Sequence, residues 1–572
     1  MIKKYFHFVL AAIYFLVLTL LVTYPLIHHF KDSIVGGYGD GVYFVWLIRW
    51  YQSVLLEGKG VPFFNPMMNF PEGWNLSTTD TTLASALPGV PFSALFGPIA
   101  GYNIALWITF ILSGLCMYVW VHHFTKSAKA ALIAGTIYAF LPYRIAHFDA
   151  GHLNLSGTAW FPLYFMGLYG VVNSNKKYPW GYMIATAVSL GLIALTSMYY
   201  LYFTILMTII FVIGYLIFQN WRVILKPAFW ISTVITSILS VPLLYIALKP
   251  FLSLSDQGGL ANRTMEYANE YSASPTDFFT FASSHFLFGK WISSVFDRSL
   301  WIESSLYIGI FSLILVILAL VWKNKSEHKA LICISILVIL SAIVLALGPS
   351  LHWNNRQVFL NLPWLGLDNV KIPLPTLLLF KYLPFFSKMR AVLRIGFFAL
   401  LFAAFAAGFG ADLLLRKFRV KTQYWLTALI IGLVLFDFYP GSFLSSIQKI
   451  EARPVDFWLA EQPGKGAVTQ MPFMKSTDQE QIFFTLTHHK PITSGFFNAN
   501  QPPQFQYLAP ILERFPDQKS IDTLREYQVE YILINPVVYP HFIDVETKML
   551  QLGMEFRTEQ SGIRVYGFSD AP

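Results

Sequence analysis

Charged residues are scarce in this chain of 572 residues, of which Asp, Glu, Lys and Arg make up 12%. A soluble globular protein carries roughly 25% of them. Hydrophobic residues make up 55% of the chain, and its mean hydropathy is +0.53. This composition excludes a soluble or disordered protein and predicts a chain that crosses a membrane many times.

Cysteine is also rare, since the chain has only Cys116 and Cys333, both within apolar runs. The two cannot form a disulfide framework or a thiolate metal site. The sequence has no P-loop, HExxH or GxSxG motif, and GGYGDG at 36–41 fits no nucleotide-binding pattern. The net charge of +9 is spread along the chain rather than gathered in one patch. Nucleic acid is therefore not expected as a partner.

Long apolar runs are abundant, and a transmembrane helix needs about 20 largely apolar residues. The sequence predicts eleven spans, near residues 8–29, 101–122, 130–142, 157–172, 180–197, 198–218, 228–248, 303–322, 330–348, 391–415 and 422–439. The apolar stretch 83–99 contains three prolines, which fit an interfacial or re-entrant segment better than a twelfth span.

The charges that do occur are distributed unevenly across these spans. Fifteen of the 29 Lys and Arg residues before residue 440 fall in short loops on one side, and thirteen of the sixteen Asp and Glu residues fall on the other. Cytoplasmic loops are enriched in Lys and Arg. The pattern therefore predicts an N-terminus inside the cell and, after eleven spans, a C-terminal part outside.

The chain becomes more polar near residue 440. Residues 440–572 hold 11 Lys or Arg and 15 Asp or Glu, whereas the preceding 439 residues hold 45 charged residues in all. The apolar pattern of this tail predicts a small α/β domain. Its expected helices cover 453–462, 521–528 and 541–551, and its expected strands cover 466–472, 529–535 and 563–568.

We therefore predict an α-helical polytopic membrane protein with about eleven transmembrane helices and a small C-terminal extracytoplasmic α/β domain. Residues 1–439 would form the membrane domain, and residues 440–572 the outer domain. The outer loops would cover 30–100, 143–156, 249–302 and 349–390. Because only short basic turns face the cytoplasm, the function is expected at the outer membrane–water interface.

One acidic residue of the first outer loop, Asp40, stands between Gly39 and Gly41. Glycine lets the backbone bend close to a ligand, so this carboxylate is a candidate general base or metal ligand. A turn residue that caps the next helix is the competing interpretation. The aromatic-rich segment 42–60 then predicts an amphipathic helix along the membrane interface.

The short second outer loop crowds together Arg144, His147, Asp149 and His152. Polar clusters beside a membrane are costly and usually mark function. Three interpretations remain open. The last three residues would form a zinc or manganese site, although their spacing matches no established metal motif. The cluster would otherwise be a structural hydrogen-bonded network, or a phosphate site with Arg144 as the cation and the histidines as donors.

Three further cations, Arg263, Arg390 and Arg394, lie in or beside the later outer loops. Arg390 and Arg394 are four residues apart at the mouth of the tenth span, a spacing that places both on one helix face. Snorkelling to lipid headgroups is the alternative for each of them. Together with Arg144, the three would clamp a phosphate or diphosphate lipid.

Several segments carry a family resemblance through their order along the chain. They are GDG at 39–41, FNPMMNFPEG at 64–73, GYNIALWITFILSG at 101–114, YRIAHFDAGHLNLSGTAWFPL at 143–163, MRAVLRIGFFALLFAAFAAGFGADLL at 389–414, RPVDFWLAEQPGKGAVTQMPF at 453–473 and VEYILINP at 529–536. In these segments the chain resembles the GT-C superfamily of integral membrane glycosyltransferases, particularly bacterial members that end in a soluble extracytoplasmic domain.

The resemblance implies a hexosyltransferase of the bacterial cytoplasmic membrane. Such an enzyme moves a sugar from a polyprenyl-phosphate donor to an acceptor on the outer face, which is an envelope polysaccharide, a teichoic acid, a lipid or a protein. A single displacement would invert the anomeric centre.

The resemblance also implies roles for individual residues. Asp40 corresponds to the first-loop aspartate that acts as base or binds a divalent cation such as Mg or Mn. Arg144, Arg390 and Arg394 correspond to donor-phosphate ligands, and the outer-face cation Arg263 joins them as a candidate. Many members carry a second acid in this loop, whereas Asp40 is flanked by glycines, so dependence on a metal stays open.

Three other functions compete with this one. A flippase or transporter would show repeated halves and a polar midplane, and the sequence has neither. A polymerase or ligase of lipid-linked glycans would use the same cations. A non-catalytic envelope scaffold would tolerate Asp40→Asn, which a transferase would not.

Overall fold

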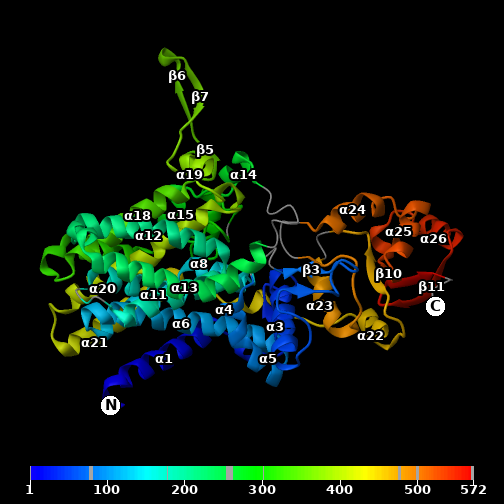
Figure 1. Ribbon diagram of the computed structural model, residues 1–572, viewed down its shortest axis with the longest axis horizontal. Helices are drawn as coiled ribbons and strands as arrows, with labels where there is room; N and C mark the ends of the chain where they lie inside the picture. The colour runs from blue at the N-terminus through cyan, green and yellow to red at the C-terminus, as the bar shows by residue number, and fades with distance from the viewer. Residues whose placement is uncertain are drawn as a thin grey trace. The chain divides into compact units, whose positions relative to one another are not determined.

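The structure is a computed structural model that describes residues 2–76, 81–174, 176, 178–252, 262–300, 302–474, 478–496 and 501–568. The chain divides into two compact units (Figure 1). Unit 1 comprises Met1–His28, Thr82–Ser85 and Ala105–Ser445, and unit 2 comprises His29–Thr81, Ala86–Ile104 and Ser446–Pro572.

Each of the eleven predicted apolar runs forms a helix. These helices are α1 (Ile2–Val22), α6 (Pro98–Thr125), α7 (Ala128–Ala139), α10 (Trp160–Asn173), α11 (Trp180–Thr196), α12 (Met198–Phe218), α13 (Pro227–Leu252), α17 (Ile310–Val321), α18 (Lys329–Ala346), α20 (Phe397–Leu415) and α21 (Val420–Phe438). In the part of the chain that the structure describes, six helices are long and apolar enough to span a membrane: α6, α12, α13, α18, α21, and α20 with the turn before it. The predicted fold class, a polytopic helical membrane protein, is confirmed.

Helix α20 lies at the centre of unit 1, because its whole apolar length is buried. Small residues allow its neighbours to approach closely. A Cβ atom on Gly410 would lie 1.9 Å from the carbonyl oxygen of Leu315 in α17, and one on Gly408 would lie 2.7 Å from Val121 in α6. Other helices expose apolar stripes: on α12, Ile205, Ile209, Ile213 and Ile217 are all exposed, as expected of a lipid-facing surface.

The proline-rich stretch 83–99 forms short helices rather than one span. They are α4 (Leu83–Ala86), the 3-10 turn η2 (Leu87–Gly89) and α5 (Val90–Phe96). Pro88 and Pro91 each stand at the start of a new turn or helix, where the missing amide hydrogen costs nothing. The prolines thus divide the stretch as the sequence predicted.

Unit 2 contains a four-stranded sheet in the order β11-β12-β10-β9. Strands β9 (Ala467–Met471) and β10 (Val529–Ile534) are parallel, whereas β12 (Ile563–Phe568) runs antiparallel to β10 and to the edge strand β11 (Met554–Gln560). The helices of the tail are α22 (Pro454–Glu461), α23 (Asp478–His488), α24 (Pro503–Leu512), α25 (Gln518–Glu526) and α26 (Phe542–Gln551). Every predicted tail element is present, while α23, α24 and β11 were not predicted.

Unit 2 also includes most of the first loop, which the sequence assigned to the membrane domain. Strand β1 (Ser33–Val35) pairs antiparallel with β8 (Ile447–Lys449). Farther along, the Asn69 amide donates to the Ser494 carbonyl at 2.6 Å. These backbone hydrogen bonds join segments more than 400 residues apart, which composition does not reveal. Independent folding of residues 440–572 stays a prediction.

Helix α3 (Asp40–Leu56) forms in the aromatic-rich segment for which the sequence predicts an amphipathic helix along the membrane interface. Residues 41–48 of α3 are all buried, so this part of the helix has no polar face. It packs against α5 and α23 within unit 2. The aromatic residues that suggested a membrane belt instead pack inside unit 2, where Tyr43 and Trp46 stack at 5.9 Å.

Candidate functional site

The second loop folds into two short helices, α8 (Pro142–Asp149) and α9 (Leu153–Ser156). Proline at the first position of α8 has its φ angle already set for a helix. Gly151 adopts a φ of +74°, which allows the chain to reverse after α8. The reversal places the His152 amide 2.8 Å from the His147 carbonyl, so the two histidines face each other.

Arg144 of α8 is completely buried. Its Nη2 donates to Thr109 Oγ1 and to the Ser156 carbonyl, both at 3.2 Å, and its guanidinium lies 4.5 Å from the centre of the Phe110 ring. Its Nε and Nη1 have no hydrogen-bond partner among the residues that the structure describes. Burial lowers the pKa of Arg144 to about 10, so the side chain remains charged at neutral pH. A buried cation with unused donors is costly to the fold and is a candidate anion ligand.

His147 and His152 contact each other, with their Nδ1 atoms 2.8 Å apart. His147 is fully buried, and burial lowers its pKa well below the ordinary value. His147 is therefore neutral at pH 7, and one ring donates to the other. The Nε2 atom of His147 has no partner in the described part of the chain, which leaves it available to a ligand.

Arg394 is also buried, but it is paired with an acid. Its Nε donates to Glu303 Oε2 at 2.9 Å, and its Nη2 donates to Glu303 Oε1. Sequence reasoning did not single out Glu303, although an acid placed directly before an apolar run was a usable signal. The pairing compensates the charge of Arg394 within the protein.

Arg390 and Arg394 do not share a helix face, contrary to the prediction from their spacing. Arg390 lies in a bend, and Arg394 lies in the 3-10 turn η8 (Val392–Gly396), because α20 begins only at Phe397. Tyr199 connects the two: its hydroxyl accepts from the Arg390 amide at 3.3 Å, and its ring lies 5.1 Å from the Arg394 guanidinium.

Arg263 and Arg390 converge on neighbouring tyrosines of α14 (Met265–Glu270) and its C-cap. The guanidinium of Arg263 lies 5.2 Å from the Tyr267 ring, and that of Arg390 lies 5.3 Å from the Tyr271 ring. The two rings are 4.9 Å apart. Since aromatic faces attract cations, these contacts place two cations at one side of unit 1.

A tyrosine pair connects the second loop to α12. The hydroxyls of Tyr143 and Tyr200 are 3.2 Å apart, and Tyr200 donates to the Leu155 carbonyl at 2.7 Å. Tyr200 follows the Tyr199 that contacts both later arginines. Tyrosines therefore contact both the second loop and the later arginines. Unit 1 contains six of the predicted site residues: Arg144, His147, His152, Arg263, Arg390 and Arg394.

Asp40 belongs to unit 2, where it is the first residue of α3. The preceding Gly36 and Gly37 have φ angles of +84° and +64°, which favour glycine. A Cβ atom on Gly41 would lie 2.9 Å from Ile34 and 3.2 Å from the Tyr102 hydroxyl. Gly41 of the GDG segment thus has a packing reason, and Asp40 stands where the helix dipole favours an acid.

The second loop does not fit the zinc or manganese site that its residues suggested. Within the described ranges, no three His, Cys, Asp or Glu side chains come together as a metal would require. His147 and His152 direct their Nδ1 atoms at each other rather than at a shared centre with Asp149. The zinc or manganese interpretation of the second loop is therefore not supported, and no step below uses a metal.

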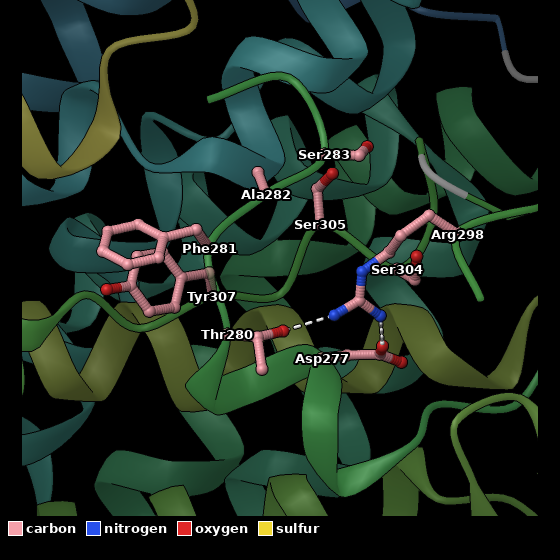
Figure 2. A pocket seen from close by; sticks show the side chains of 9 residues that line it. All are labelled: Asp277, Thr280, Phe281, Ala282, Ser283, Arg298, Ser304, Ser305 and Tyr307. Atoms are coloured by element: carbon pink, nitrogen blue, oxygen red, sulfur yellow. Dashed lines mark hydrogen bonds and ion pairs between the residues drawn. The ribbon is translucent and has the colours of Figure 1, made fainter. Parts of the chain in front are cut away.

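A second buried ion pair stabilises the loop before α17. Figure 2 shows the Arg298 guanidinium directed at Asp277 and Thr280 in a narrow crevice that Ser304 and Ser305 also line. Asp277 also accepts from the Ser274 amide at 2.8 Å. Burial raises the pKa of Asp277 to about 6, against the effect of Arg298. Asp277 therefore links Ser274 to Arg298, and Ser304, which lines the same crevice, follows Glu303 in the sequence.

Solved structures of membrane glycosyltransferases share this fold. The oligosaccharyltransferase of Archaeoglobus fulgidus in the apo form has a TM-score of 0.54 and 13% identity, over 100% of this chain and 75% of that one. ArnT from Cupriavidus metallidurans bound to undecaprenyl phosphate has a TM-score of 0.50 and 10% identity, over 97% of each chain. A mutant of the mycobacterial arabinofuranosyltransferase AftD has a TM-score of 0.52 and 11% identity, over 98% of this chain and 41% of that one.

The predicted GT-C fold is thereby confirmed, at identities that show the fold alone. No curated protein matches the sequence. One family model does match, over residues 58–372, which is more than half of the chain. The protein is a member of the family described as "Domain of unknown function (DUF6311)".

Proposed function

We propose that this protein is a membrane glycosyltransferase that takes its sugar from a polyprenyl-phosphate donor. The observation that carries the proposal is Arg144, a fully buried cation with two unused donor atoms, inside a fold shared with glycosyltransferases. ArnT, one of these, was solved with undecaprenyl phosphate bound. A lipid phosphate is an anion that a buried guanidinium at the membrane–water interface can meet.

Arg144 is the phosphate ligand in this proposal. The phosphate leaves as the bond between the anomeric carbon and its oxygen breaks, so negative charge grows on that oxygen. A donor preorganised in a site of low dielectric stabilises such charge strongly. The neutral His147, with its free Nε2, donates a hydrogen bond to the same phosphate when Nε2 carries the proton. Arg390 and Arg263, held by tyrosines, attract the anion from the side of α14.

Arg394 has a different role. Two of its guanidinium nitrogens already donate to Glu303, so fewer hydrogen-bond donors remain for a ligand. We assign Arg394 and Glu303 to positioning: the pair fixes η8 against the loop before α17, and Tyr199 and Tyr143 pack beside it.

Asp40 is the proposed base. The acceptor hydroxyl attacks the anomeric carbon, its proton passes to the Asp40 carboxylate, and the lipid phosphate departs with the bonding electrons. Proton removal of this kind contributes roughly 10²–10⁴-fold to a rate. Asp40 lies in unit 2, and the arginines lie in unit 1. This attack from one side inverts the anomeric centre, which the linkage of the product tests.

The remaining details of the proposal follow from charge distribution and resemblance. The enzyme lies in the bacterial cytoplasmic membrane with its N-terminus inside, and the transfer takes place on the outer face. The acceptor is an envelope polysaccharide, a teichoic acid, a lipid or a protein. Residues 440–572 contribute to the acceptor side, since they pair with the segment that carries Asp40.

The test is complementation of a strain that lacks the protein, followed by mass spectrometry of its envelope glycans. Wild type should restore a modification of hexose size, and Asp40→Asn, expressed at the same level, should not. Asp544→Asn is the matched control, because Asp544 is an exposed acid in the first turn of α26 in the same unit. It should restore the glycan fully.

Two results would contradict the proposal. If Asp40→Asn restores the glycan as well as wild type does, Asp40 is a helix-terminal residue and not the base. If deletion changes no envelope glycan, a scaffold or a transporter fits the fold better.

A further inference from the structure

A two-stranded hairpin extends from unit 1 between α18 and α20. Its strands are β6 (Phe359–Leu362) and β7 (Leu367–Lys371), which pair antiparallel around the turn η6 (Pro363–Leu365). Figure 1 shows the hairpin projecting beyond α19 (Thr376–Tyr382) at the top of the view. A lone two-stranded hairpin is only marginally stable in water, so a further surface is needed to hold it.

The hairpin is apolar on both of its faces. Successive residues of a strand point to opposite faces, and the neighbours Phe359 and Leu360 are both exposed. Val370 on the paired strand is exposed as well, and at the tip Trp364 is 77% exposed. A hairpin that folds back on its own protein would bury one of these faces.

The exposed apolar surface continues into the segment after the hairpin. Leu378 and Tyr382 of α19 and Phe385 after it are all exposed, with Tyr382 at 77%. Lys381 lies among them in the sequence, and Lys388 follows them. Aromatic residues interspersed with lysine are typical of the membrane–water interface.

The charge of this loop departs from that of the other long loops on the same predicted side. Residues 349–390 hold five Lys or Arg and one Asp, whereas acids outnumber bases in 30–100 and in 249–302. Loops on the outer side are usually poor in Lys and Arg, so a local excess needs a partner. Anionic lipid headgroups attract basic segments at a membrane surface.

We infer that the hairpin β6–β7 and α19 form a lipid-binding arm, which lies on the outer leaflet with Trp364 inserted and its basic residues against anionic headgroups. The loop begins after α18 and ends before α20, both of which are membrane helices, so its roots lie at the membrane surface. The arm contains none of the residues proposed above for the base or for phosphate binding.

The test uses the full-length protein in vesicles of phosphatidylcholine with and without phosphatidylglycerol. Cys116 and Cys333 are first replaced by alanine, and Trp364→Cys is labelled with an environment-sensitive fluorophore. Ile209→Cys on the lipid-facing stripe of α12 is the lipid control, and Lys519→Cys, exposed on α25, is the water control. Leu360→Cys serves as a second arm position if the tip variant misfolds.

The label at position 364 should be quenched by brominated lipid as the label at 209 is, and it should resist aqueous iodide. Phosphatidylglycerol should increase the quenching of this label by brominated lipid. The double variant Lys371→Gln and Lys381→Gln should lose that increase. Iodide quenching equal to that at position 519 would place the arm in water and overturn the inference. Protection from both quenchers would show that a protein covers the arm, and would overturn it too.

Discussion

Two buried arginines of unit 1 differ in how their charge is compensated. Arg394 and Glu303 form two hydrogen bonds with each other, whereas Arg144 has only a hydroxyl, a carbonyl and an aromatic ring around it. A buried ion pair is complete by itself, and removing one partner leaves an expensive charge. The charge of an unpaired buried cation is instead compensated only when an anionic ligand binds. The contrast assigns Arg394 to structure and Arg144 to binding.

The strongest test of this contrast is Glu303→Gln. It leaves the Arg394 charge buried without its acid, so we expect the free energy of unfolding to fall by about 3–5 kcal/mol. Thermal unfolding of the detergent-purified protein measures this loss. Glu266→Gln, at an exposed acid in the first turn of α14, should unfold as wild type does. An unchanged midpoint for Glu303→Gln would show that the ion pair contributes no stability.

Arg144→Met should give the opposite pattern. Loss of one preorganised donor at a developing charge lowers a rate about 10²–10³-fold, so the envelope glycan should nearly vanish at low expression. Stability should change by less than about 2 kcal/mol, because relief of the buried charge offsets the lost hydrogen bonds.

Arg394→Met is the comparison for that variant. It leaves the Glu303 carboxylate buried without its cationic partner and should destabilise the protein more than Arg144→Met does. If Arg144→Met keeps full glycan levels or unfolds as readily as Arg394→Met, the assignment of Arg144 to binding is wrong.

The smallest expected effect concerns His147, which burial keeps neutral. Its unfolded form has a pKa of about 6.5, so the unfolded state binds more protons below that pH and stability falls as the pH falls. Between pH 7.5 and 5.5 this costs about 1.4 kcal/mol. His147→Gln should remove that part of the pH dependence of the unfolding midpoint.

A matched histidine separates this effect from the rest of the protein. His489→Gln changes an exposed histidine and should keep the pH dependence of wild type. Other groups, such as the buried His488, whose pKa burial lowers to about 3, are present in both wild type and His147→Gln, so their contributions cancel in that comparison. Equal slopes for wild type and His147→Gln would contradict a buried, neutral His147.

Much of the fold was predictable, because a helix that crosses a lipid bilayer must consist largely of apolar residues. Each apolar run became a helix, and proline divided 83–99 as predicted. The tail strands and helices were predictable where the apolar pattern is strong, as in 529–534, whose apolar run is typical of a buried strand. The edge strand β11 was missed because its sequence, MEFRTEQ, is mostly polar and exposed, so no apolar pattern indicated it.

The candidate site was only partly predictable. The crowding of Arg144, His147 and His152 into one short loop was visible in the sequence, and the structure places the two histidines in contact. Glu303 was missed because its partner, Arg394, lies 91 residues away. The shared helix face expected for Arg390 and Arg394 was wrong, because spacing of four has that meaning only inside a helix.

The sequence by itself determined that this protein crosses a membrane, how many apolar helices it forms and where the polar tail begins, because each depends on the composition of short segments. Only the tertiary structure decided which arginine has an acid beside it, that His147 faces His152, and that the first loop joins the tail through β1 and β8. These facts depend on contacts between distant segments. Hydrogen bonding and burial in the folded chain determine such contacts, and local pattern does not encode them.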